Sequence, residues 1–310
     1  MKRLLSVDGG GIRGILPALV LSALELQAGK NCAALFDLVA GTSTGGIIAA
    51  GLCCGVPAAQ LLKLYTQRGP DIFKRRWQHW FGLSGPKYDN AALKQILTET
   101  LGVARLGDPS AKPELLVTSF ELSPDYGPRY FKSWQAKGML LDAKARWQDY
   151  DFALSDVALA TSAAPTYFPA AEAIAASGSP KRYLVDGGVH ANNPVLAAVI
   201  SAEQLWPGEP VEVLSIGTGT AVKPLDGAGA EGWGAAEWLP HIVNVCIDGS
   251  AANAAYWTAL LANAKVTRVQ CELPPQGSAM DDASQANRTL LQQLGVQLAK
   301  DNLEALALFA

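Results

Sequence analysis

A serine held between two glycines is the first feature of this sequence that could do chemistry. The run GTSTG (41–45) follows the apolar run FDLVA (36–40) and precedes the small-residue segment GIIAAGLCC (46–54). A serine on a sharp turn from strand to helix is lifted clear of the sheet, and flanking glycines leave room for the neighbouring elements. The helix dipole and free amides after the serine favour developing negative charge. The pattern predicts a nucleophile elbow with Ser43 as the nucleophile.

Chance is the competing explanation for this motif, because a chain with 30 glycines contains many glycine-flanked residues. The context favours chemistry, since a predicted strand and a predicted helix stand where a nucleophile elbow requires them.

A second glycine run, DGGGIRG (8–14), lies directly after the first predicted strand and before the first predicted helix. Successive glycines let the backbone turn its N–H groups toward one point, which suits an oxyanion hole. The same residues satisfy the dinucleotide pattern GxGxxG, which needs an acidic residue at the end of the next strand. The candidate, Asp37, stands at the start of its strand, so we favour the oxyanion hole over a nucleotide site.

An activated serine needs a base, and the chain holds only three histidines, His79, His190 and His241. Asp186 ends the apolar run RYLVD (182–186) at a glycine pair, where an α/β sheet presents functional side chains. A carboxylate with a pKa near 4 is a weak base, so a Ser43–Asp186 dyad requires direct contact and a low dielectric. A Ser-Asp-His arrangement through His190 stays open as the alternative.

The scaffold must bring these three segments together. Apolar runs bounded by Gly or Asp predict strands at 3–8, 36–41, 114–120, 129–134, 182–186, 211–217 and 265–273. They alternate with helical patterns at 15–28, 45–54, 57–68, 89–101, 154–163, 194–205, 241–263 and 284–308. This alternation predicts an α/β fold with a central, mostly parallel sheet flanked by helices on both faces.

Composition bounds the protein class. Of 310 residues 49% are apolar and 17% are charged, with a net charge of −3. We expect one domain over 1–310, because no loop is long enough to be a linker. We expect no nucleic-acid partner, since no basic field exists. Five cysteines show no metal or disulfide spacing and suggest small buried residues, so we expect no metal and no cofactor.

The expected location follows from the N-terminus and from hydropathy. The chain begins with a strand-like run rather than a leader sequence, and no 18 consecutive residues are apolar. We therefore expect a cytoplasmic protein without a spanning helix. The sequence leaves the oligomeric state open.

Together and in this order, the three motifs resemble one family, the patatin-like phospholipases, which are lipid acyl hydrolases with a Ser-Asp dyad. The likeness continues through 86–97, 154–170, 184–199 and 214–220, and so covers roughly residues 3–220. It implies a patatin-like three-layer fold, Ser43 as nucleophile, Asp186 as base, and an oxyanion site formed by the amides of Gly10 and Gly11 with Arg13 beside them. The remaining motif glycines are Gly9, Gly14, Gly41, Gly45, Gly187 and Gly188.

The resemblance also implies a phospholipid or other lipid ester as substrate and an acyl-Ser43 intermediate. By analogy with bacterial members it further suggests a membrane-degrading effector activated by a signal molecule. A different class of function, a lipid- or nucleotide-binding module without turnover on the same scaffold, is the alternative.

Two further segments carry hypotheses about membranes and access. Phe73, Trp77 and Trp80 fall at helical spacing among basic residues, which fits either packing in the core or, as our hypothesis, peripheral contact with the inner face of the membrane. The glycine-rich stretch 220–234 is either a lid or a solvated connector.

Overall fold

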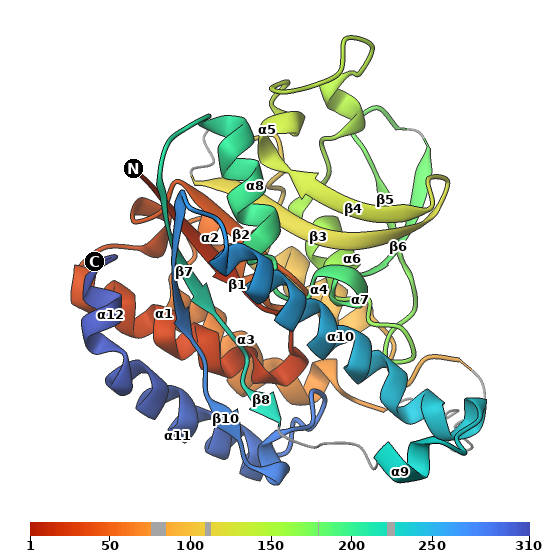
Figure 1. Cartoon of the computed structure of the whole chain (residues 1–310). Coiled ribbons are helices and arrows are strands. Elements are labelled where there is room, and N and C mark those ends of the chain that lie inside the picture. The colour runs from red at the N-terminus through yellow and green to blue at the C-terminus, as the bar shows by residue number, and fades with distance from the viewer. Residues whose placement is uncertain (76–84, 109–112, 179, 222–226) are drawn as a thin grey trace.

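The structure of the chain is a computed structural model that describes residues 1–75, 85–108, 113–178, 180–221 and 227–310. Within those ranges an eight-stranded sheet has the order β5-β6-β3-β2-β1-β7-β9, with β4 paired to β3 (Figure 1). Its strands are β1 Lys2–Val7, β2 Leu38–Gly41, β3 Glu114–Ser123, β4 Gly127–Lys132, β5 Ala171–Ile174, β6 Lys181–Asp186, β7 Val211–Ile216 and β9 Ala264–Val269. A small parallel pair, β8 Thr220–Ala221 and β10 Glu272–Leu273, lies apart from it.

The centre of the sheet is parallel and one side is antiparallel. Strands β3, β2, β1, β7 and β9 pair in parallel, whereas β4 and β6 run antiparallel to β3, and β5 runs antiparallel to β6. Parallel strands bring their carboxyl ends to one edge of the sheet, which is where α/β proteins place functional loops. The ends of β1 and β2 therefore carry the glycine run and Ser43 to the same edge.

Helices cover both faces of the sheet, as the sequence predicted. One face carries α1 Ile15–Ala28, α2 Thr44–Cys53, α3 Ala58–Ile72, α4 Ala91–Leu101, α6 Leu154–Thr161 and α11 Gln285–Asp301. The other carries α5 Ser133–Ala136, α7 Gly188–Ala191, α8 Val195–Leu205 and α10 Ala235–Ala259. Short helices α9 Gly227–Ala230 and α12 Leu303–Ala307 complete the chain. Figure 1 shows α11 alongside α1, and α10 running across the face that α8 covers.

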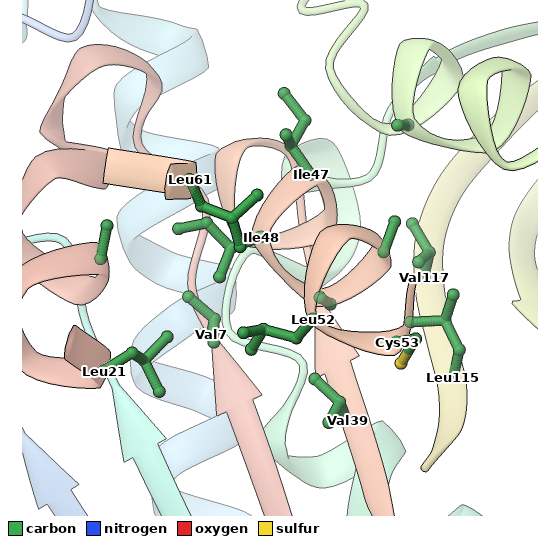
Figure 2. Packing of buried hydrophobic residues seen from close by; sticks show 14 of the residues in the cluster. Val7, Leu21, Val39, Ile47, Ile48, Leu52, Cys53, Leu61, Leu115 and Val117 are labelled. Atoms are coloured by element: carbon green, nitrogen blue, oxygen red, sulfur yellow. The ribbon is translucent and has the colours of Figure 1, made fainter. Parts of the chain in front are cut away.

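The alternation of strand side chains divides the core in two. In β1, Leu5 and Val7 face the larger helical layer, whereas Leu4 faces the layer of α8 and α10. Figure 2 shows α2 at the centre of the larger core, where Ile48 and Leu52 lie among side chains from β1, β2 and α3. The helix that follows Ser43 is buried along its whole length, and this burial holds its first residue, Thr44, against the sheet.

The segment Gly11–Ala28 is long and apolar enough to span a membrane by length and composition alone, with a mean hydropathy of 1.3. Polar residues such as Arg13, Ser22 and Glu25 interrupt the segment, so it is not a continuous apolar run. In the fold more than half of the segment is buried, against the sheet, α3 and α11. This burial in the protein core accounts for its apolar composition.

The predicted fold class is confirmed, and the differences lie in short or edge elements. The prediction missed β5, β8, α5, α7 and α9, and split or merged others: 265–273 is β9 plus β10, and 284–308 is α11 plus α12. Helix α10 begins at 235, whereas the sequence pattern predicted its start at 241, directly after Pro240. The cysteines are all unpaired, and Cys246 is exposed, contrary to the expected burial.

Candidate active site

Ser43 lies at the turn between β2 and α2 in a strained backbone conformation. Its φ of 52° and ψ of −123° fall outside the regions that a residue with a side chain normally adopts. The turn is held because the Ser43 N–H donates to Thr161 Oγ1 over 2.7 Å and the Ser43 carbonyl accepts from Ile47 N–H. The predicted nucleophile elbow is therefore present as a strand-to-helix turn.

The glycines that flank Ser43 are required by close approach of backbone. A Cβ on Gly41 would collide with the carbonyl of Gly45, and a Cβ on Gly45 would collide with the carbonyl of Val7. Gly14 is limited in the same way by Thr44 Oγ1 and the Tyr65 ring. These positions let β1, β2 and α2 meet tightly enough to place Ser43 at the end of the sheet.

Asp186 ends β6 and meets Ser43 directly. The Ser43 hydroxyl donates to Asp186 Oδ2 over 2.6 Å, and Asp186 Oδ1 accepts the N–H of Gly188 over 2.7 Å. Gly187 allows the chain to turn here, because a Cβ at that position would collide with Thr118. The structure brings together the two residues that the sequence singled out, 143 positions apart.

Burial sets the proton affinity of this carboxyl. Desolvation raises the pKa of Asp186 to about 6, although the hydrogen bonds from Ser43 and from Gly188 favour the charged form. A carboxylate with a pKa near 6 is a better base at neutral pH than an exposed aspartate. An unperturbed pKa near 4, which is all that the sequence alone suggests, therefore understates the basicity of this buried carboxylate.

The glycine run at the end of β1 faces Ser43. Gly9 is anchored, since its N–H donates to the Asn192 carbonyl over 3.0 Å and its carbonyl accepts from Thr218 Oγ1 over 2.7 Å. The next two amides, of Gly10 and Gly11, have no protein acceptor within the described ranges, and both residues line the same cavity as Ser43. Unpaired amides beside a serine hydroxyl can receive the negative oxygen of a tetrahedral intermediate.

The Arg13 side chain supports this loop and is not part of the cavity wall. Its guanidinium donates to the carbonyl of Gly10 over 3.3 Å and to that of Gly219 over 3.5 Å. Burial lowers the pKa of Arg13, while Asp248 and Asp8 favour its charged form. Because the carbonyl of Gly10 is held by Arg13, the opposite side of the loop can present its amides to the cavity. The structure therefore places Arg13 as a positioning residue.

Asp8 precedes the glycines and is paired with a residue that the sequence analysis did not identify. Arg268 on β9 donates to both carboxylate oxygens of Asp8 and also to Ser215 Oγ over 2.8 Å. A bidentate pair at the ends of β1, β7 and β9 fixes the strand end from which the loop starts.

Asp37, the acidic candidate of the dinucleotide interpretation, lies at the opposite end of the sheet from the glycine run. It accepts from the Arg3 N–H over 2.9 Å and from Lys2 Nζ over 3.2 Å, at the start of β1. Since β1 and β2 are parallel, Asp37 is separated from Gly10 by the length of β1. It cannot contact a ribose bound at the glycine run.

His190 lies away from Ser43 Oγ and does not line the cavity. Its ring stands between Phe120 and Tyr130, with centroid separations of 6.1 and 5.6 Å, and neither ring nitrogen has a partner within the described residues. Burial lowers the pKa of His190 to about 4. The alternative base has no contact with the serine, which is already bonded to Asp186.

An apolar cavity opens at Ser43. It contains about 790 Å³ of space, part of it continuous with solvent, and its wall includes Gly10, Gly11, Ser43 and Asp186. The rest is mainly hydrophobic, with Ile47 from α2, Ile72 from α3, Leu93 from α4, Phe168 from the segment after α6, and Val243 and Ile247 from α10. A cavity with this apolar lining suits an alkyl chain whose polar end lies at the serine.

Phe73 belongs to this wall, and its half-buried ring packs against the core, 5.5 Å from the ring of Tyr88. Membrane contact through Phe73 stays a prediction. Trp77 and Trp80 lie outside the described residues, as do 222–226 of the stretch considered as a lid. In the rest of that stretch α9 covers Gly227–Ala230. No group of three or more metal-binding side chains converges among the described residues.

A serine at a strand-to-helix turn, at the carboxyl edge of an α/β sheet, is a feature of serine hydrolases of α/β build, and here the serine is hydrogen-bonded directly to a buried acid. Comparison with known proteins narrows the class. The family model described as patatin-like phospholipase matches residues 5–199. The chain belongs to the patatin-like phospholipase family, whose members are lipid acyl hydrolases.

Curated relatives agree over nearly the whole chain. Patatin-like protein 2 of Arabidopsis thaliana is 32% identical in an alignment 348 positions long, which covers 96% of this chain and 82% of that protein. Patatin-17 of Solanum cardiophyllum is 33% identical in an alignment 339 positions long, which covers 97% of this chain and 84% of that protein.

Two solved structures match at 13% identity and a TM-score of 0.41. VipD from Legionella pneumophila matches over 97% of this chain and 67% of its own, and the type III effector protein ExoU over 98% and 53%. At that TM-score these likenesses add nothing to the assignment.

Proposed function

We propose that this protein cleaves fatty acyl esters of phospholipids or glycerolipids through an acyl-Ser43 intermediate, with Asp186 as the base and the amides of Gly10 and Gly11 as the oxyanion hole. The observation that carries the proposal is the 2.6 Å hydrogen bond from Ser43 Oγ to Asp186 Oδ2 at the mouth of an apolar cavity. Family membership supports the lipid substrate.

The reaction follows from these contacts. Ser43 Oγ attacks the ester carbonyl carbon while its proton passes to Asp186 Oδ2, and the carbonyl oxygen becomes an oxyanion that accepts from Gly10 and Gly11. As the intermediate collapses, Asp186 returns the proton to the leaving alcohol. Water then attacks the acyl carbonyl carbon and loses a proton to Asp186; as the bond to Ser43 Oγ breaks, Asp186 returns that proton to Oγ and the fatty acid leaves.

The strained turn and the buried acid both serve this chemistry. The backbone at Ser43 directs Oγ toward Asp186, which removes the need for reorientation before attack. Burial of Asp186 destabilises its charged form and so favours uptake of the serine proton. A dyad can work without histidine because the acid and the nucleophile are in direct contact.

The test is hydrolysis of a p-nitrophenyl ester by the wild type, Ser43→Ala and Asp186→Asn. Both variants should lose at least 10³-fold in kcat. Asp156→Asn is the matched control, since Asp156 is a partly buried aspartate on α6 outside the cavity, and it should retain wild-type turnover. Wild-type protein that binds lipid but shows no turnover would favour the non-catalytic alternative.

We also propose a cytoplasmic location, supported by five unpaired cysteines, one of them exposed, which suit a reducing compartment. If the protein cofractionated with a marker protein of an oxidising compartment, the proposed location would be contradicted. An effector role belongs to the same proposal, and it predicts low activity on vesicles until a cytosolic extract is added. Full activity of the purified protein alone would contradict the need for an activator.

A further inference from the structure

A second cavity lies beside the apolar one and differs from it in polarity. It contains about 860 Å³ of space, part of it continuous with solvent, and its wall includes Arg75, Lys87, Tyr88, Asp281 and Asp282. Two cationic and two anionic side chains therefore face one cavity. The proposed hydrolytic mechanism uses none of them.

The charged groups form an organised network. Lys87 is paired with Asp281, and the hydroxyl of Tyr88 donates to the same carboxylate over 2.6 Å. The Lys87 ammonium also stands 5.4 Å from the ring centre of Tyr88 and 5.5 Å from that of Tyr167. Lys87 and Asp281 are both mostly buried, so their charges depend on partners rather than on water.

The remaining two charges complete the polar wall. Arg75 forms a backbone bridge with Tyr88, and its side chain is exposed toward the same region. Asp282 caps the following turn, since its Oδ1 accepts from the Ser284 N–H over 2.9 Å. Within the described residues the other carboxylate oxygen of Asp282 has no hydrogen-bond donor. The wall thus offers positive charge from Arg75 and Lys87, on the two segments that the bridge joins, and negative charge from Asp281 and Asp282.

The two cavities share a wall next to the proposed oxyanion loop. Phe73 lines both, and the ring of Tyr88 lies 5.5 Å from that of Phe168, which lines the apolar cavity. Met280 also lines the apolar cavity, and its carbonyl accepts from the Ile12 N–H over 2.8 Å. Asp281 is the next residue, about 3.8 Å of chain away. The polar cavity therefore begins one residue from a contact with the loop of Gly10 and Gly11.

We propose that the polar cavity binds the headgroup of a zwitterionic phospholipid, with its phosphate at Lys87 and Arg75 and its ammonium group at Asp281 and Asp282. This rests on the proposed function, since it gives the headgroup a place when the ester lies at Ser43 and an acyl chain lies in the apolar cavity. A zwitterion can separate Lys87 from Asp281 and leave each buried charge with a new partner. An anionic headgroup would supply no cation for the carboxylates, and a diacylglycerol would supply neither charge.

The test compares kcat/KM on phosphatidylcholine, phosphatidylglycerol and diacylglycerol with identical acyl chains in the same detergent micelles, each divided by kcat/KM on a p-nitrophenyl ester. The wild type should favour phosphatidylcholine over both other lipids by at least tenfold. Asp281→Asn should reduce the phosphatidylcholine ratio about tenfold and change the phosphatidylglycerol ratio little, because it removes the negative charge that attracts the choline ammonium group. Lys87→Gln should reduce both phospholipid ratios and change the diacylglycerol ratio little.

The matched control is Lys181→Gln, which breaks the exposed ion pair between Lys181 on β6 and Glu172 on β5 and should keep the wild-type kcat/KM ratios. Equal wild-type rates on the three lipids, or equal changes of all three ratios in Asp281→Asn, would overturn the headgroup site. Hydrolysis of the p-nitrophenyl ester under the same conditions would show that the proposed function itself stands. Its absence in the wild type would instead refute the proposed function.

A binding measurement without turnover keeps the proposal testable if a variant folds poorly. Ser43→Ala is mixed with vesicles of diether phosphatidylcholine or diether phosphatidylglycerol, and bound protein is measured by sedimentation. Ser43→Ala should bind the phosphatidylcholine vesicles more tightly, and adding Lys87→Gln should reduce that difference several-fold. Equal binding to both vesicles would overturn the headgroup site.

Discussion

The Ser43 hydroxyl and the Asp186 carboxylate meet over 2.6 Å because β2 and β6, which carry them, pair one after the other with the same edge of β3, whose other edge pairs with β4. Ser43 follows β2 at its carboxyl end, and Asp186 ends the antiparallel β6 opposite Ser119 of β3. The two residues meet because β3 is longer than β2, so that β6 pairs with the part of β3 that extends beyond Gly41. The antiparallel side of the sheet therefore supplies the acid that the parallel side lacks.

The pH dependence of kcat/KM should follow the ionisation of Asp186. Only the carboxylate can accept the serine proton, and burial raises the pKa of Asp186 to about 6. Activity on a p-nitrophenyl ester should therefore rise through about pH 6 and level off above pH 7. A half-maximal point near pH 4 would show that the carboxyl is not desolvated in the free enzyme.

Stability should carry the opposite pH dependence from the same group. The pKa of Asp186 is higher in the folded chain than in the unfolded one, so its contribution favours folding at low pH and is lost as pH rises from about 4 through 6. At pH 8 the free energy of unfolding of Asp186→Asn should thus exceed that of the wild type by up to about 3 kcal/mol. The variant should therefore unfold at a higher denaturant concentration. At pH 4 the two should be similar. A variant less stable than the wild type at pH 8 would contradict this.

Thr161 should act as a positioning residue for the nucleophile. Thr161→Val keeps the shape of the side chain but removes the acceptor of the Ser43 N–H, at a cost of about 1–3 kcal/mol in stability. We expect kcat to fall more than tenfold with KM changed little, because the turn rather than the cavity is affected. Thr161→Ser retains the hydroxyl and should restore both kcat and stability. Failure of Thr161→Ser to restore kcat would show that the methyl group, not the hydrogen bond, matters.

Gly10 should tolerate no side chain. A Cβ at this position would collide with the Thr218 side chain, which itself holds the Gly9 carbonyl. Gly10→Ala should therefore displace the amides that face Ser43 and lower kcat by about 10²–10³. The double variant with Thr218→Gly removes the Thr218 Cβ as well as its hydroxyl, makes room for the methyl group and should recover part of kcat. A single variant with normal kcat would mean that these amides do not bind the oxyanion.

His190 should be dispensable for catalysis. Its ring lies between Phe120 and Tyr130, so His190→Phe should keep kcat within a few-fold and leave the rise of activity near pH 6 in place. Burial lowers the pKa of His190 to about 4, so the wild type loses stability as pH falls from about 6.5 toward 4, and the variant should lose less. Chemical denaturation at pH 5 and pH 7 measures this. Loss of the rise near pH 6 would assign the base to His190.

The sequence predicted the elbow and the glycine run because local backbone geometry determines them. Gly41 and Gly45 are needed for contacts between consecutive elements, and such needs leave a readable spacing. The Ser43–Asp186 contact followed from the family resemblance and from Asp186 ending a strand. The alternation of strands and helices then gave the sheet.

The residues that were missed act across the fold and leave no local pattern. The site receives hydrogen bonds or an ion pair from residues far along the chain: Thr161 on α6, Asn192 directly after α7, Arg268 on β9 and Met280 in the C-terminal segment. The sequence left two roles open for the aromatic segment near Phe73, because helical spacing shows that a face is apolar, but not whether protein or membrane covers it. The raised pKa of Asp186 likewise depends on burial that only the folded chain shows.

The most direct measurement is peptide mass spectrometry of protein quenched with acid during turnover of a p-nitrophenyl ester. The account predicts the acyl mass on the peptide that contains Ser43 in the wild type, its absence in Ser43→Ala, and its much slower appearance in Asp186→Asn. Turnover with the acyl group on another residue, or an acyl-Ser43 that forms equally fast in Asp186→Asn, would contradict it.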